Sequence, residues 1–174
     1  MRRLLIGIAL ATLVCSIVCG PALASTVKLS PTEQRVLQLV NCERAKRDLA
    51  PLHVQYNLMR AARVHSRTMA TVPFFSHVSP SGLSPCERAI AFGYTVAGCR
   101  SWSLAENIAW GYGSASTAEQ IVRGWMNSPS HRRNILTAAF RDIGIGVAQS
   151  TLTPGGRRVA LARYFTIDLA RRIR

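Results

Sequence analysis

The 174-residue chain has few acidic side chains and almost no lysine. It contains 8 Asp and Glu residues against 22 Lys and Arg, and Lys28 and Lys46 are the only lysines. The formal charge of +14 at pH 7 therefore comes almost entirely from arginine. Such a charge favours anionic partners such as envelope polymers, lipid headgroups or nucleic acid, and says nothing about fold. A biased composition with solvated arginines is the alternative interpretation.

Motifs that identify common enzyme classes are also missing. There is no H-E-x-x-H motif, and Ser114 lacks the glycine two residues earlier that a nucleophile elbow needs. The basic charge is accompanied by no recognition-helix pattern or aromatic platform, so a nucleic-acid-binding module is not favoured. No internal repeat is visible, and a chain of this length with 48% hydrophobic residues is expected to form one folded domain.

The N-terminal segment has the organisation of a secretory signal. Arg2 and Arg3 precede an apolar stretch from Leu4 to Cys19, and Ala22-Leu23-Ala24 forms a cleavage site. We therefore predict a secreted protein, extracellular or periplasmic, with a mature charge of +14 − 2 = +12. The apolar stretch is slightly long for a signal, so an uncleaved membrane anchor is the alternative.

Three cysteines remain after cleavage, and export would place them in an oxidising compartment. Cys86 and Cys99 flank one short predicted helix and its turn, so we expect a disulfide between them. Closing a loop of about that length is worth about 3 kcal/mol in the chain-entropy model. Cys42 falls in a row with Leu39 and Ala45 on the first predicted helix, which predicts a buried free thiol.

Capping boxes, in which Ser or Thr is followed three residues later by Glu, occur at residues 30–33, 84–87 and 116–119. They predict three helix starts, and they give Glu87 a structural role in place of a catalytic one. A further helix is predicted from about Asn57, with apolar residues at spacings of three and four. His65 lies inside that stripe, so we expect a hydrogen-bonded core or boundary histidine and not a ligand. The residues expected to be buried are Val36, Leu37, Val40, Leu58, Ala61, Ala62, Met69, Ile121, Val122, Trp125 and Met126.

Three strands are predicted, at residues 104–111, 143–150 and 159–168, with a hairpin at Pro154-Gly155-Gly156 between the last two. Alternation along the first strand places Glu106 on the same face as Ile108 and Trp110. A carboxylate on such a face must be paired, hydrogen-bonded or near water.

Short polar clusters at residues 74–77, 106–109 and 125–136 are the candidates for a site. Pro129 restricts the residue before it, so we expect His131 on a fixed corner. We also expect the fold to bring His77, Glu106 and His131 together. Two imidazoles and a carboxylate suit a divalent metal of the zinc type with an open position for water, or general acid–base chemistry. Structural roles for all three residues are the alternative.

Several motifs together resemble one known family, the bacterial branch of the CAP superfamily (cysteine-rich secretory proteins, antigen 5 and pathogenesis-related 1 proteins). They are Phe75-Ser-His77-x-Ser-Pro-x-Gly82, Arg88 with Gly93-Tyr94, Glu106-Asn-Ile-Ala-x-Gly111, Trp125-Met-Asn-Ser-Pro-x-His131-Arg-x-Asn134-Ile-Leu and Ile143-Gly-Ile-Gly-Val147. The resemblance implies an α+β fold, a three-layer α-β-α sandwich around an antiparallel sheet. It covers residues 33–168, so the expected organisation is a signal (1–24), a short lead (25–32), one domain (33–168) and a basic tail (169–174), which its arginines lead us to expect to be frayed.

The resemblance also implies a central cleft formed by His77, Glu106 and His131, in which the histidines bind a divalent metal in some members. Eukaryotic members have a second glutamate three residues after the tryptophan that matches Trp125, and Ser128 occupies that position here. Members are known mainly as secreted binding or effector proteins, some for sterols or fatty acids. The expected function is a binding module for a divalent metal and a small apolar or lipid ligand. A metal-dependent hydrolase of peptides or cell-wall material, with Glu106 as general base, is the alternative.

Overall fold

The structure is a computed structural model and describes residues 28–173. The predicted signal, residues 1–24, and Arg174 lie outside the described residues. Within the described part, no helix is both long and apolar enough to span a bilayer. The elements in chain order are α1 (Pro31–Ala45), β1 (His53–Val54), α2 (Tyr56–Thr71), α3 (Pro85–Ala91), β2 (Ser101–Tyr112), the 3-10 helix η1 (Gly113–Ser116), α4 (Ala118–Asn127), α5 (Pro129–Leu136), β3 (Asp142–Leu152) and β4 (Arg158–Ile173).

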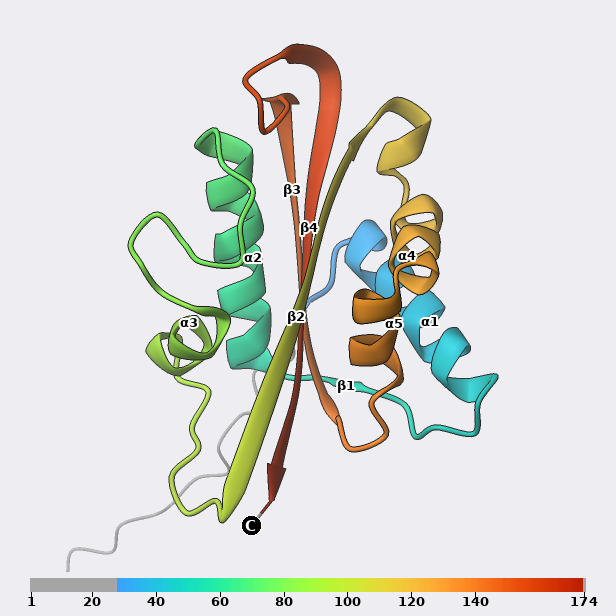
Figure 1. The fold of residues 1–174 in the computed structure, drawn as a ribbon, viewed down its shortest axis with the longest axis vertical. Helices are drawn as coiled ribbons and strands as arrows, with labels where there is room; N and C mark the ends of the chain where they lie inside the picture. Colours follow the sequence, from blue (N-terminus) through green and yellow to red (C-terminus); the bar gives the residue numbers. More distant parts are fainter. Residues whose placement is uncertain (1–27, 174) are drawn as a thin grey trace, which may run out of the picture.

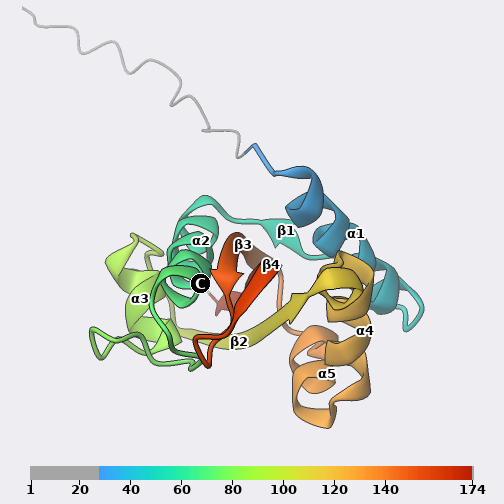
Figure 2. The same ribbon diagram turned by 90° about the horizontal axis from the view of Figure 1, so that it is seen from above.

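One sheet with the strand order β1-β3-β4-β2 lies between two helical layers (Figure 1). The strands β3, β4 and β2 are antiparallel, whereas the two residues of β1 pair parallel to β3. Helices α2 and α3 cover one face, and α1, α4 and α5 cover the other (Figures 1 and 2). The predicted three-layer α+β fold is thus confirmed. Strand β2 forms an edge of the sheet, and this position matters for the site.

Two of the three predicted capping boxes are present. Ser30 and Ser84 each accept a hydrogen bond from the backbone of the Glu three residues later, and that Glu side chain accepts one from the cap backbone in return. The third prediction was wrong in its register. Thr117 is the N-cap of α4 and accepts from Gln120 N, while Ser116 closes η1 by donating to Gly113 O at 2.8 Å.

Helix α2 packs directly on the sheet because β3 carries glycine where the helix crosses it. A Cβ on Gly144 would lie 2.3 Å from the backbone of Leu58, and one on Gly146 would lie 2.2 Å from Ala62 O. Ser66 Oγ fills the contact by donating to Gly146 O at 2.9 Å. The predicted buried stripe of α2 is confirmed, since Leu58, Ala61, Ala62, His65 and Met69 are all buried.

The C-terminal residues are not a frayed tail. Strand β4 continues to Ile173, which pairs with Ser101 of β2. Arg172 bonds Asp142 at 3.2 Å and lies over the ring of Tyr94 at 4.7 Å. The sheet therefore extends five residues past the predicted end of the domain at residue 168. Cross-strand pairing and an ion pair hold the arginine-rich end in place.

The chain turns between α4 and α5 at Ser128, three residues before His131, where the sequence predicted the turn. Ser128 is at once the C-cap of α4 and the N-cap of α5, and Pro129 occupies the first position of α5. Proline is tolerated there because the first helical N–H needs no partner within the helix. His131 is therefore held on the first turn of a helix.

The predicted disulfide is not formed: Cys42, Cys86 and Cys99 are all free thiols in the structure. The Cys86 side chain is partly buried, and burial raises the pKa of its thiol. A protonated thiol is a poor nucleophile for disulfide exchange. The prediction of a buried Cys42 was also wrong, because the buried face of α1 follows Val36 and Val40, and Cys42 lies off that face, exposed.

Candidate functional site

Glu106 is at the centre of the site. It lies on β2 and is buried, and its two carboxylate oxygens are both used. Oε1 is 2.8 Å from Nδ1 of His77, and Oε2 accepts from Nη2 of Arg88. A carboxylate can only accept hydrogen bonds, so Nδ1 of His77 must carry a proton. In the neutral imidazole the lone pair then lies on Nε2, on a ring whose side chain is half exposed.

Arg88 holds the loop that carries His77. This buried side chain on α3 donates to His77 O at 2.8 Å, Ser79 Oγ at 3.1 Å and Leu83 O at 3.2 Å, besides its bond to Glu106. Its charge compensates the buried carboxylate, as a buried ion requires. Sequence reasoning gave Arg88 no role in the site beyond its place in a motif, because in an arginine-rich chain a buried arginine cannot be told from a solvated one.

His65 supports the same loop from α2. It is buried, and its Nε2 lies 2.9 Å from Ser76 O and 3.9 Å from Oε1 of Glu106. Burial lowers the pKa of His65, so the ring is neutral at neutral pH. The predicted hydrogen-bonded core histidine is confirmed for Nε2, whereas Nδ1 is buried without a partner in the described structure.

His131 reaches the site from the opposite face of the sheet. Successive strand residues point to opposite faces, so Glu106 faces α3 while Asn107 faces α5. Asn107 Nδ2 donates to His131 O at 3.0 Å, and Asn134 Nδ2 donates to Asn107 Oδ1 at 2.8 Å. Because β2 is an edge strand, no further strand separates the side of the sheet that carries His77 from the side that carries His131. Burial and the nearby His77 lower the pKa of His131.

The structure thus joins His77 directly to Glu106. Between residues 28 and 173, no hydrogen bond or ion pair links the His131 ring to either of them. Nor does any group of three His, Cys, Asp or Glu side chains in that range have the arrangement of a metal site. The histidines nevertheless suit a metal as a pair, since burial and mutual repulsion favour the neutral His131 and Nε2 of His77 is free of protein partners among the described residues.

Asp168 is a second carboxyl group behind Glu106 that sequence reasoning missed. It lies on β4, directly opposite Glu106 on β2 and Gly144 on β3. It is fully buried, and within the described structure neither carboxyl oxygen has a hydrogen-bond partner. Burial and the charge of Glu106 raise the pKa of Asp168 well above its ordinary value, which favours the neutral form of this carboxyl group. Asp168 is the only acidic residue of β4, between Ile167 and Leu169, and that was the signal that could have identified it.

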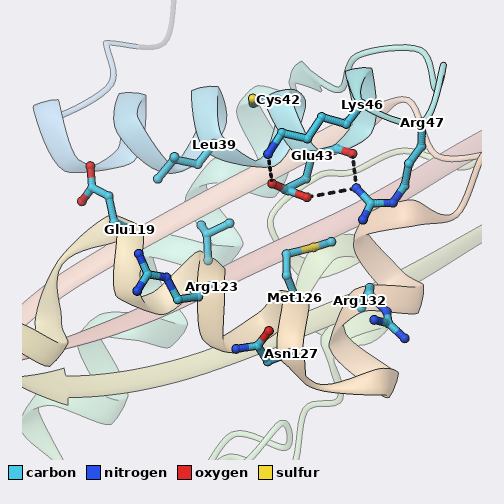
Figure 3. Close-up of a pocket in the computed structure, with 11 residues that line it drawn as sticks. Leu39, Cys42, Glu43, Lys46, Arg47, Glu119, Arg123, Met126, Asn127 and Arg132 are labelled. Carbon is cyan, nitrogen blue, oxygen red and sulfur yellow. Dashed lines mark hydrogen bonds and ion pairs between the residues drawn. The ribbon is translucent and has the colours of Figure 1, made fainter.

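A separate groove of about 470 Å³ lies between α1 and the helices α4 and α5 (Figure 3). Leu39, Val122 and Met126 supply apolar surface, and charged side chains surround them. Glu43 is paired with Lys46 at 2.6 Å and with Arg47 at 3.0 Å. Arg123 and Arg132 make no ion pair within the described residues and give this groove an excess of positive charge.

The family model for the cysteine-rich secretory protein family, CAP, matches residues 37–166. The chain belongs to the CAP family. YkwD of Bacillus subtilis, which is uncharacterized, is 40% identical over 124 residues, covering 70% of this chain and 44% of YkwD. The uncharacterized membrane protein YlbC of the same organism is 32% identical over 122 residues, covering 70% of this chain and 33% of YlbC.

Solved structures share the CAP fold. An extracellular SCP-domain protein from Bacillus anthracis superposes with a TM-score of 0.63 at 24% identity, over 84% of this chain and 45% of that one. An outer surface protein from Borrelia burgdorferi has a TM-score of 0.62 at 18% identity, over 84% and 96% of the two chains. The CAP chain described here spans less than half the length of the two Bacillus subtilis relatives.

Proposed function

We propose that this CAP domain is an exported binding module. Its cleft holds a divalent metal such as zinc between His77 and His131, and its α1–α4 groove takes a small lipid-like ligand. The observation that carries the metal proposal is the bond from His77 Nδ1 to Glu106, which is itself fixed by Arg88. Metal-binding histidines characteristically donate their second ring N–H to a carboxylate in this way.

In this proposal Glu106 contacts the metal-binding residue His77 and does not contact the metal itself. Both of its oxygens are already bonded, so it orients His77 and raises the basicity of Nε2 without contacting the ion. His77 and His131 then supply two protein ligands, and solvent or a bound partner supplies the others. Ser128 stands where eukaryotic members have glutamate, so the cleft lacks that second carboxylate.

Calorimetric titration with zinc chloride tests the metal site. The wild type should bind one equivalent at neutral pH, and His77→Ala and His131→Ala should each abolish binding. His53→Ala, at an exposed position on β1, is the matched control and should bind as the wild type does. Glu106→Gln should weaken binding by about 10- to 100-fold, as loss of an outer-shell partner does. Wild-type protein that takes up no zinc would remove the proposal.

The pH dependence of zinc binding follows from the same ligands. Protons compete for neutral imidazoles, so affinity should fall with pH. Because the pKa of His131 is lowered, protons should compete with the metal for this ring only below the ordinary histidine pKa of about 6.5.

The groove between α1 and α4 supports the lipid-like ligand. Its apolar floor suits an acyl chain, and Arg123 and Arg132 suit an anionic headgroup. Native mass spectrometry with laurate should detect one bound molecule, and Arg123→Glu should weaken binding. Arg60→Glu, an exposed change on α2, is the control. A laurate adduct of equal occupancy in Arg123→Glu and the wild type would place the ligand elsewhere.

Export is supported by the predicted signal at residues 1–24 and by the relatives described as extracellular or outer-surface proteins. The intact mass of the purified protein should correspond to a chain that begins at Ser25. A mass that includes residues 1–24 would favour the anchored alternative.

The hydrolase hypothesis has less support. A general base must be free to accept a proton from water, whereas both oxygens of Glu106 are bonded to protein donors. Metal-stimulated turnover of a peptide or cell-wall substrate that is lost in Glu106→Gln would restore it.

A further inference from the structure

The outer edge of β2 is covered by side chains over its middle residues. Asn134 Nδ2 donates to Glu106 O at 3.4 Å, and Trp125 Nε1 donates to Ile108 O at 3.2 Å. The carbonyl groups at 106 and 108 therefore point away from the sheet and toward α4 and α5. The side chains of these two helices take the place of a neighbouring strand along this part of β2.

The sheet register shows that the backbone of Trp110 points the same way. Ile143 O accepts a hydrogen bond from Gln55 N, so the backbone groups of Ile143 point toward β1. The direction alternates from one residue to the next along a strand, and Ala148 is five residues further along β3. The backbone N–H and C=O of Ala148 therefore point toward β4. Ala148 is paired with Tyr164 of β4, so the backbone N–H and C=O of Tyr164 point toward β3. On its other side Tyr164 is paired with Trp110 of β2. The N–H and C=O of Trp110 consequently face outward. No side chain and no other element among residues 28–173 bonds to them.

A groove of about 420 Å³ runs along this open edge. Ile108, Ala109 and Trp110 form one wall, and the other residues that line it are Ala115, Gln120, Ile121, Gly124, Trp125, Ser128 and His131. Gly124 lies inside helix α4, where glycine is less favourable than alanine. A Cβ there would meet nothing within 4 Å, so no contact among the described residues requires the glycine. Its effect is to leave more room in the groove at this position.

We propose that this edge binds an extended acidic peptide segment, which pairs with Trp110 as an added strand. Unpaired backbone groups of an edge strand are the recognition element for such a segment. The groove lining contains no acidic residue. At its outer end Arg163 donates to Ser116 O at 3.3 Å and Arg157 lies over Tyr112 at 5.4 Å, so the local charge is positive. His131 also lines this groove, so the bound segment would lie beside the cleft that we propose to hold the metal.

The test uses an acetylated, amidated decapeptide of alternating Glu and Val as the probe, titrated into ¹⁵N-labelled protein. Shifts should concentrate on the amides of Trp110 and Gly124. The same peptide N-methylated on the residues of one edge keeps its side chains and loses its backbone donors, and should bind about tenfold more weakly or worse. A Lys and Val peptide should also bind more weakly. Equal affinity for the N-methylated peptide would overturn strand pairing.

Gly124 provides matched variants. Gly124→Phe fills the groove and should weaken peptide binding by about tenfold or more, while Gly124→Ala should retain it. Zinc binding should be unchanged in both, which confirms an intact fold and separates this proposal from that for the cleft. Unchanged peptide affinity in Gly124→Phe would overturn the proposal. A second result would also overturn it: the wild type binds no peptide but forms a dimer, and Gly124→Phe abolishes that dimer. The edge would then bind a second copy of the chain.

Discussion

Glu106 on β2 and Asp168 on β4 are directly paired across the two strands. In the described structure only one of these two carboxyl groups, that of Glu106, is bonded to a guanidinium, that of Arg88. Arg88 donates to Glu106, whereas the Asp168 carboxyl has no hydrogen-bond partner among residues 28–173. Two carboxylates so close in a dry interior cannot both carry charge. The two carboxyl groups therefore differ: Glu106 is paired with Arg88 beside the histidines, whereas the raised pKa of Asp168 favours its neutral form.

This asymmetry predicts how stability depends on pH. The pKa of Asp168 is raised in the folded protein, so its contribution to stability is present below the unfolded value of about 3.9 and is lost as pH rises toward the folded pKa. Asp168→Asn, which is always neutral, should remove that decline and leave the protein at least as stable as the wild type at pH 7. Urea unfolding between pH 3 and 7 measures the effect.

Asp48→Asn is the control for the Asp168 change. Asp48 is exposed and has a φ of 55°, a conformation that Asn also accepts, so its stability profile should parallel that of the wild type. A steeper loss of stability at neutral pH in Asp168→Asn would mean that Asp168 is ionised and paired in solution.

At the scale of helices and strands, local patterns in the sequence were informative and long-range contacts were not. The caps at Ser30 and Ser84 and the apolar stripe of α2 follow from neighbouring residues, and the structure confirms them. The continuation of β4 through Arg172 depends on Asp142 and Tyr94, which are distant in sequence. An arginine pattern typical of a solvated tail cannot reveal such partners.

The same distinction applies to the site. His77 and Glu106 stand in motifs, and the structure places them in contact. The roles of Arg88 and Asp168 depend on burial and on pairing across strands, which one sequence does not display.

Helix α1 is joined to the end of α5 by one buried arginine. Arg44 is fully buried and donates to the carbonyl oxygens of Ala50, Ile135, Thr137 and Phe140, at 2.8, 2.7, 3.0 and 3.3 Å. Arg44→Met keeps much of the volume but leaves these carbonyls without a donor. We expect a loss of roughly 3 kcal/mol in the free energy of unfolding. Denaturant unfolding measures it.

Arg35→Met is the control for Arg44, since the side chain of Arg35 forms an exposed ion pair with Glu119. It should cost less than about 1 kcal/mol. Similar losses in the two variants would show that the carbonyl contacts of Arg44 contribute little.

The contact between α2 and β3 gives a second prediction for the elements. Gly146→Ala places a Cβ against the backbone at Ala62, which cannot move without displacing the helix. Overpacking of this kind costs about 1–3 kcal/mol or more. Gly155→Ala, in the β3–β4 hairpin with nothing within 4 Å, should have a much smaller effect on the melting temperature. Equal melting temperatures for the two variants would contradict the close packing.

For the molecule as a whole, most acidic side chains already form contacts within the protein. Five of the eight form ion pairs: Glu33, Glu43, Glu106, Glu119 and Asp142. Asp168 is buried, and Glu87 caps α3. The remaining acid, Asp48, is exposed, so most exposed arginines in the described part of the chain remain uncompensated. The excess charge is thus a property of the surface, and it should govern association with polyanions.

Binding to anionic polymers should therefore be strong at low salt and indifferent to polymer chemistry. If three phosphates are neutralised, affinity for a DNA duplex should fall roughly 40-fold between about 50 and 200 mM salt. Inorganic polyphosphate and a carboxylated polysaccharide of similar charge density should show comparable affinities and slopes. Arg132→Ala with Arg133→Ala, two exposed changes on α5, should reduce the slope, because fewer counterions are then released. Fluorescence anisotropy at several salt concentrations measures both quantities. If DNA is bound far more tightly than the polysaccharide at equal salt, recognition is specific for nucleic acid and the purely electrostatic account fails.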